Sequence, residues 1–350
     1  MEKAAGGKIV GRQGARVFEY DLVRVVACLM IVAMHAPMPS AEEHSPFLVG
    51  LSYLCAPGIP LFFMLSGALV LPVRQPLAPF LRRRLGRILW PLLVWTFLYL
   101  LVLQPVRGGA PLWQRLLSLP FSVQGHSTLW FLYTLAGLYL LAPLVSAGLE
   151  RLTEHGLRLY LLLWGGTLLF PLLGQVLTVG SGETSGWYYL SGYAGYFILG
   201  YYLRRFGLPF PVWTAGVLAV LAACAPFLCF LAGWHVDFYR QFWYLSVFVA
   251  AMGIGWWALV TEGCRRLSPP AAVVRAVTGF SDLTFGIYLV HIYVLRSFLW
   301  RQGWIAGIAP DVLRTLVLVL LGSLLSALLC WALSRIPGAE YVIGYRRKKR

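Results

Sequence analysis

The chain has 350 residues, of which 59% are hydrophobic and only 12% are charged, and its mean hydropathy is +0.73. Because a soluble domain carries about 25% charged residues, this composition excludes an ordinary soluble globular protein. The formal net charge of +16 does not indicate nucleic-acid binding, since the basic residues stand between apolar runs and are not interleaved with polar residues. We therefore expect an all-α integral membrane protein, a polytopic helix bundle.

Apolar runs recur from about residue 20 to residue 334, with short polar gaps between them. Because an α-helix needs about 20 apolar residues to cross a bilayer, these runs predict about ten transmembrane helices. The sequence thereby divides into a cytoplasmic N-terminal segment 1–19, a transmembrane domain 20–334 and a basic cytoplasmic tail 335–350. The predicted spans are 20–38, 48–71, 86–104, 127–148, 157–178, 187–205, 211–233, 241–261, 281–301 and 312–334.

The distribution of basic residues predicts the orientation of the chain. The connections after the second, fourth, sixth and eighth predicted spans are rich in arginine, as are both ends of the chain. The alternate connections hold few basic residues and contain Glu42, Glu43 and Glu183. The positive-inside rule therefore places both termini in the cytoplasm. The sequence shows no inverted repeat of short interrupted segments, which lowers the expectation of a secondary transporter.

The first predicted span carries ionisable side chains, which are costly in a membrane unless they face a partner or a water-filled cavity. Arg24 and His35 are eleven residues apart, so they share one helix face about 16 Å apart along the axis. A structural reading pairs Arg24 with Asp21 at a helix end and makes His35 a hydrogen-bonded helix-end histidine. The shared face favours a functional role for both.

An arginine run opens the third predicted span. Such a run can be a positive-inside anchor that touches lipid headgroups. The alternative is a phosphate site, because Arg84 and Arg87 at positions i and i+3 point the same way and the guanidinium fork suits phosphate oxygens.

The second predicted span contains Pro57, Pro60, Ser66 and Gly67, which permit a kink or close helix packing. Packing is the favoured interpretation, and Ser66 as a nucleophile is a distant second, because no nucleophile-elbow pattern surrounds it.

Histidines in two other predicted spans complete the set of candidates. In the ninth span, Tyr288 and His291 lie on adjacent turns of one face, and we expect a role in a catalytic cavity rather than an incidental hydrogen bond. His126 precedes Trp130 at the outer end of the fourth span, where an aromatic belt explains the aromatic residues. No pair of histidines has metal-ligand spacing, so no metal is expected.

These motifs occur in an order that resembles the membrane-bound acyltransferase-3 family, over about residues 20–331. The resemblance implies a ten-helix inner-membrane enzyme that uses cytoplasmic acyl-CoA as co-substrate, with no permanently bound cofactor. It would acylate, commonly acetylate, a hydroxyl of a glycan or lipid-linked sugar. The motifs are Asp21-x-x-Arg24-x10-His35, Phe62-Phe63-x-x-Ser66-Gly67, Arg84-x-x-Arg87 before Pro91, Leu129-Trp130-Phe131-Leu132 and Tyr288-Leu289-Val290-His291.

By this resemblance, His35 is expected to be the general base and Arg24 to position the donor or stabilise developing negative charge. Arg84 and Arg87 would bind the acyl-CoA phosphates. Many relatives carry an extra extracytoplasmic hydrolase-like domain, whereas only Ser334 to Arg350 follow the tenth span here, so transfer would be completed within the membrane domain. The residues expected on the substrate side are Ser66, His126, Trp130, Tyr288 and His291.

Three points stay open at this stage. The sequence places no carboxylate where it would orient His35, and it does not predict the oligomeric state. A transporter or flippase could use the same polar cavity to move a glycan or a small polar substrate. An assembly or sensing component could instead bind a lipid-linked glycan through aromatic outer loops.

Overall fold

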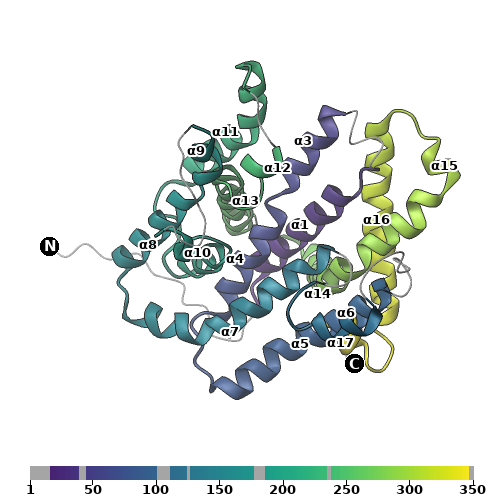
Figure 1. Ribbon diagram of the computed structural model, residues 1–350, viewed down its shortest axis with the longest axis horizontal. Coiled ribbons are helices and arrows are strands. Elements are labelled where there is room, and N and C mark those ends of the chain that lie inside the picture. The colour runs from purple at the N-terminus through teal and green to yellow at the C-terminus, as the bar shows by residue number, and fades with distance from the viewer. Residues whose placement is uncertain are drawn as a thin grey trace.

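The structure, a computed structural model, describes residues 16–38, 45–100, 111–123, 127–176, 186–234, 238–267 and 269–346. The regular elements in these ranges are helices (Figure 1). In chain order they are α1 (Phe18–His35), α3 (Pro46–Cys55), α4 (Gly58–Val70), α5 (Leu77–Leu98), α6 (Leu112–Ser118), α7 (Trp130–Arg151), α8 (Glu154–Thr167), α9 (Phe170–Val176), α10 (Ala194–Phe206), α11 (Val212–Leu231), α12 (Phe238–Gln241), α13 (Val247–Arg266), α14 (Ala271–Ile292), α15 (Gly303–Ala306), α16 (Asp311–Leu333) and α17 (Ala339–Ile343).

Within the described residues, seven helical stretches are long and apolar enough to cross a membrane. This confirms the prediction of an all-α membrane protein. Three predicted spans are not among the seven: α1 has three charged side chains in its first two turns, α5 has four arginines, and α10 has only 13 residues. Ten crossings with cytoplasmic termini therefore stay a prediction. The seven stretches are Leu48–Val70, Ser127–Arg151, Glu154–Leu173, Val212–Leu231, Val247–Arg266, Ala271–Arg301 and Asp311–Leu333.

Prolines or capping side chains mark the start of several helices. α11, α14 and α16 each follow a proline directly, which suits a helix start because the first backbone N–H groups have no partner inside the helix. At α8 the Thr153 hydroxyl accepts from the Gly156 amide at 3.1 Å, and at α13 the Ser246 hydroxyl accepts from the Val249 amide at 3.3 Å. These N-caps define helix starts in sequence that is otherwise apolar.

α1, α4 and α14 form the centre of the bundle (Figure 1). α1 packs against α3, α4, α13, α14 and α16, and α14 also packs against α16 and α17. α4 is buried on nearly all sides. Asp21 of α1 is therefore buried and Arg24 is partly buried among these helices, which is the arrangement that makes their cost tolerable.

Glycines bring α4 unusually close to α10. A Cβ atom at Gly67 would collide with the backbone of Phe197, and one at Gly200 would collide with the backbone of Met64. Each helix thus presents a glycine to the other, so the two backbones touch. The helix is also interrupted before α4, at Pro57. The kink and the close packing expected of this segment are both present.

The rim of the bundle is strongly apolar. α11 and α16 expose most of their large side chains, which would be costly in water but match the acyl chains of a bilayer. The exposed residues include Val217, Leu221, Phe227 and Phe230 of α11 and Leu316, Leu320, Leu324 and Leu328 of α16.

Candidate functional site

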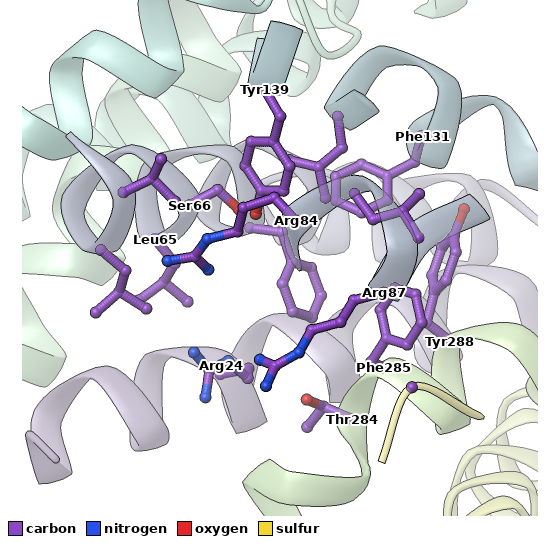
Figure 2. A pocket seen from close by; sticks show the side chains of 16 residues that line it. Arg24, Leu65, Ser66, Arg84, Arg87, Phe131, Tyr139, Thr284, Phe285 and Tyr288 are labelled. Atoms are coloured by element: carbon purple, nitrogen blue, oxygen red, sulfur yellow. The ribbon is translucent and has the colours of Figure 1, made fainter. Parts of the chain in front are cut away.

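A cavity of about 240 Å³ lies among α1, α4, α5, α7 and α14. Figure 2 shows Arg24, Arg84 and Arg87 extending their guanidinium groups into this arginine cavity. None of the described residues that line it is acidic, so its potential is positive and favours an anion. The other polar side chains on its wall are Ser66, Tyr139, Thr284 and Tyr288.

Arg84 and Arg87 lie one turn apart on α5. The guanidinium carbon of Arg84 is 5.9 Å from the centroid of the Tyr139 ring, a cation–π arrangement, and its Nε is buried without a hydrogen-bond partner among the described residues. Arg87 forms no hydrogen bond or ion pair with any described residue. A buried unsatisfied donor costs about 1–3 kcal/mol. An anion in the cavity would relieve that cost and the repulsion between the two cations.

Arg24 connects the cavity to a charged network between α1 and α14. The buried carboxylate of Asp21 lies 3.2 Å from Arg24 Nη1 and accepts a hydrogen bond from the Ser281 hydroxyl at 2.7 Å. Arg24 Nη1 also donates to Ser281 Oγ at 3.0 Å. Arg16 binds the same carboxylate and lies 2.9 Å from Asp282, and its hydrogen bond to Asp21 raises its pKa. This network fixes one edge of Arg24 where the guanidinium enters the cavity.

His35, at the C-terminal end of α1, forms a pair with His291 of α14. The ring centroids are 5.2 Å apart, and His291 Nε2 lies 3.4 Å from His35 Nδ1. His35 Nδ1 is 2.8 Å from the Ile31 carbonyl oxygen, and His291 Nδ1 is 2.6 Å from that of Tyr288. Because a carbonyl oxygen only accepts, both Nδ1 atoms carry hydrogen. The neutral His35 ring then has its lone pair on Nε2, the nitrogen able to take a proton.

The two histidines are not on the wall of the cavity, and Tyr288 links them to it. Tyr288 lines the cavity, its hydroxyl donates to the Thr128 carbonyl, and its own carbonyl holds fully buried His291. His291 in turn contacts His35. The supporting hydrogen bond that the sequence left unassigned for His35 therefore comes from the Ile31 carbonyl and the partner histidine, and no carboxylate among the described residues supplies it.

The residues of the motif Phe62-Phe63-x-x-Ser66-Gly67 lie partly on the cavity wall and partly in the helix packing around it. Phe62 and Ser66 line the cavity, whereas Phe63 stacks near Phe131 at 4.7 Å between centroids and Gly67 permits the crossing with α10. The motif therefore has one face toward the cavity and one toward the helix interface.

Trp130 and His126 were expected on the substrate side. Trp130 does not line the cavity; its ring packs against Tyr193 and Tyr244, with centroids 5.1 and 5.7 Å apart. The Tyr244 hydroxyl donates to the sulfur of Met34, the neighbour of His35. Trp130 thus belongs to an aromatic cluster near the histidine pair, while His126 lies outside the described residues.

Sequence reasoning missed several residues of the site. Ser281 is the first residue of the ninth predicted span, but no local pattern indicated that it would bind Asp21 and Arg24. Tyr139, Phe285 and Gly344 line the cavity from α7, α14 and the C-terminal segment. Their positions follow from helix packing and from the path of the chain after α16, neither of which a local pattern encodes.

Comparison with known protein families agrees with these motifs. The sequence profile of the acyltransferase-3 family, described as an acyltransferase domain, matches residues 17–335. No curated protein and no solved structure matches the chain significantly.

Proposed function

The chain belongs to the acyltransferase-3 family and is a membrane acyltransferase, and from this premise we propose that it transfers an acyl group, most simply acetyl, from cytoplasmic acyl-CoA to a hydroxyl of a glycan or lipid-linked sugar. The observation that carries the choice of donor is the arginine cavity. Its two α5 arginines have no carboxylate partner among the described residues, and its wall is otherwise largely apolar. A donor with phosphates at one end and a short acyl thioester at the other matches both features.

In this proposal Arg84 and Arg87 bind phosphate oxygens of the donor. Their guanidinium groups offer paired N–H donors, and charge-assisted bonds of this kind are about twice as strong as neutral ones. Arg24, held by Asp21 and Ser281, faces the same cavity and lies where it can bind a further phosphate oxygen and so position the donor.

The chemistry assigned to His35 is general base catalysis. The acceptor hydroxyl oxygen attacks the thioester carbonyl carbon, the carbon–sulfur bond breaks, and the hydroxyl proton passes to His35 Nε2. That proton then returns to the leaving sulfur, so CoA departs as a thiol and no covalent enzyme intermediate forms. The Nδ1–H bond to Ile31 supports this role, because it sets the tautomer that the reaction requires. Tyr288, His291, Ser66, Trp130 and His126 are proposed to lie along the substrate side.

The proposed topology supports this direction of transfer. We place α1, α5 and α10 as membrane crossings beside the seven apolar stretches, with both termini in the cytoplasm of an inner-membrane protein. α1 and α5 turn their charged residues toward the cavity or helix ends. The arginine cavity then opens on the cytoplasmic side, and His35 lies farther across the membrane.

The test supplies acetyl-CoA with a labelled acetyl group to inverted membrane vesicles that contain the full chain. Label is expected to appear in the glycan fraction, and His35→Ala at equal abundance should abolish it. Equal incorporation by the native chain and the variant contradicts His35 as the base. No incorporation by the native chain contradicts this donor and acceptor, and movement of unmodified glycan without acylation would identify a transporter.

A matched pair of arginine variants tests the donor site. Arg87→Gln removes an arginine that lines the cavity, whereas Arg82→Gln removes an arginine of the same helix that does not line it. The KM for acetyl-CoA should rise at least tenfold in the first variant and stay within twofold in the second. A similar rise in both would indicate that the arginines act through lipid headgroups.

A further inference from the structure

The C-terminal segment 339–346 returns to the bundle and completes the wall of the arginine cavity. α17 packs against α5 and α14. Trp95 of α5 donates its indole N–H to the Val342 carbonyl at 2.9 Å, and the Trp90 and Tyr341 rings meet edge to face at 6.0 Å between centroids. Ile343 is fully buried. The segment is therefore anchored on the helix that carries Arg84 and Arg87.

Gly344 ends α17 in contact with the cavity. Its φ of +69° lies in the left-handed region, which side-chain-bearing residues rarely adopt. A Cβ atom at this position would also lie 2.5 Å from Cδ1 of Phe285. Glycine is thus required by the backbone conformation and by the close approach of the Phe285 ring, which Figure 2 shows beside the C-terminal segment.

Phe285 connects this contact to the cavity. It lines the cavity together with Gly344, Thr284 and Tyr288, and it stands on α14 one turn before Tyr288. Since α17 contacts both α5 and α14, it fixes the separation between the arginine wall and the Phe285 wall. In a cavity of about 240 Å³, the Phe285 ring, which Gly344 contacts, forms a large part of the wall.

We propose that Phe285, supported by Gly344, limits the length of the acyl group that the arginine cavity accepts. This inference rests on the proposed function, in which the phosphates of acyl-CoA bind Arg84 and Arg87 and the acyl end extends past Phe285 toward His291. Truncating the ring widens the cavity along that path. A side chain at position 344 pushes the ring into the cavity and narrows it.

The first experiment measures binding of CoA, acetyl-CoA and hexanoyl-CoA to the purified full chain in lipid nanodiscs. Phe285→Ala should bind hexanoyl-CoA at least tenfold more tightly than the native chain does, with CoA itself unchanged within twofold. Phe280→Ala is the matched control, because Phe280 is a half-buried phenylalanine of α14 that does not line the cavity. An unchanged preference among the three ligands in Phe285→Ala overturns the inference.

The second experiment tests whether Gly344 supports the Phe285 ring. Gly344→Ala should weaken acetyl-CoA binding at least tenfold, and the double variant Gly344→Ala with Phe285→Ala should recover most of that loss, since the truncated ring leaves room for the new methyl group. No recovery in a double variant that unfolds at the same temperature as Phe285→Ala overturns the supporting role of Gly344. If Gly344→Ala does not fold, the Phe285→Ala comparison still decides the inference.

Failure of this inference is distinguishable from failure of the proposed function. Binding of CoA that depends on Arg87, with no change of chain-length preference in Phe285→Ala, overturns the inference alone. Absence of CoA binding by the native chain overturns the donor site and the inference together.

Discussion

The two ends of α1 contact the same partner helix, α14, in different ways. At the N-terminal end, Arg24 and Asp21 meet Ser281 in a charged network that borders the cavity. At the C-terminal end, His35 meets His291, and the Nδ1 atom of each ring lies within hydrogen-bond distance of a backbone carbonyl. One end therefore holds fixed charge, and the other holds two imidazole rings.

This difference suggests a division of labour along one pair of helices. A permanently charged guanidinium suits the binding of an anionic donor, because its charge does not change during the reaction. An imidazole whose Nδ1–H donates to a backbone carbonyl keeps its lone pair on Nε2, the nitrogen that can accept a proton. The following variants remove the interactions at each end of α1 separately. They are given from the largest expected effect to the smallest.

The largest effect is expected at the C-terminal end of α1. His35→Gln removes the proposed base while keeping a polar side chain of similar length, so kcat should fall about 100- to 10,000-fold, the usual contribution of general base catalysis. The KM for acyl-CoA should change little, because the arginine cavity is untouched. Label transfer in membrane vesicles at matched protein abundance measures both parameters, and a kcat within threefold of the native value would contradict the assignment.

A change at the N-terminal end of α1 should act on donor binding. Asp21→Asn leaves Arg24 and Arg16 without their shared carboxylate, and breaking a buried ion pair from one side costs about 3–5 kcal/mol. Both arginines retain some solvent contact, so we expect only part of that cost, seen as a rise of about 10- to 30-fold in the KM for acyl-CoA. Titration of the initial rate against acyl-CoA measures it.

The control for this variant uses a second aspartate–arginine pair with the same spacing. Asp311→Asn breaks the i, i+3 pair of Asp311 with Arg314 at the start of α16, where neither residue lines the cavity. It should leave the KM within twofold, because this pair does not contact Arg24 or the cavity. An equal rise in both variants would mean that Asp21 acts through general stability and does not position Arg24.

A smaller effect is expected when the partner histidine is changed. His291→Gln weakens the orientation of His35 but leaves the Ile31 bond in place. A single hydrogen bond contributes about 0.5–1.5 kcal/mol, so kcat should fall up to about tenfold with an unchanged KM. An unchanged rate would remove His291 from the reaction.

The sequence predicted which residues form the candidate site better than it predicted how those residues are placed relative to one another. Arg24 and His35 could be placed on one face because helical periodicity is local, and Arg84 and Arg87 could be paired for the same reason. The contact of His35 with His291 could not be predicted, since it depends on how α1 crosses a helix 256 positions later in the chain. Gly344 gave no signal either, because its role follows from the fold of the C-terminal segment.

The smallest effect is expected for a substitution in the middle of α1, between the two polar ends. Cys28 is buried on the face of α1 that meets α14, and its sulfur lies 3.8 Å from the Thr284 carbonyl oxygen. Cys28→Ala removes one buried atom and no charge, so it should cost about 1 kcal/mol of stability and change kcat and KM by less than threefold. Thermal unfolding and the vesicle assay measure the two quantities. A fall in kcat as large as that of His291→Gln would contradict this expectation. It would mean that the positions of the polar groups at both ends of α1 depend on packing along the whole α1–α14 contact.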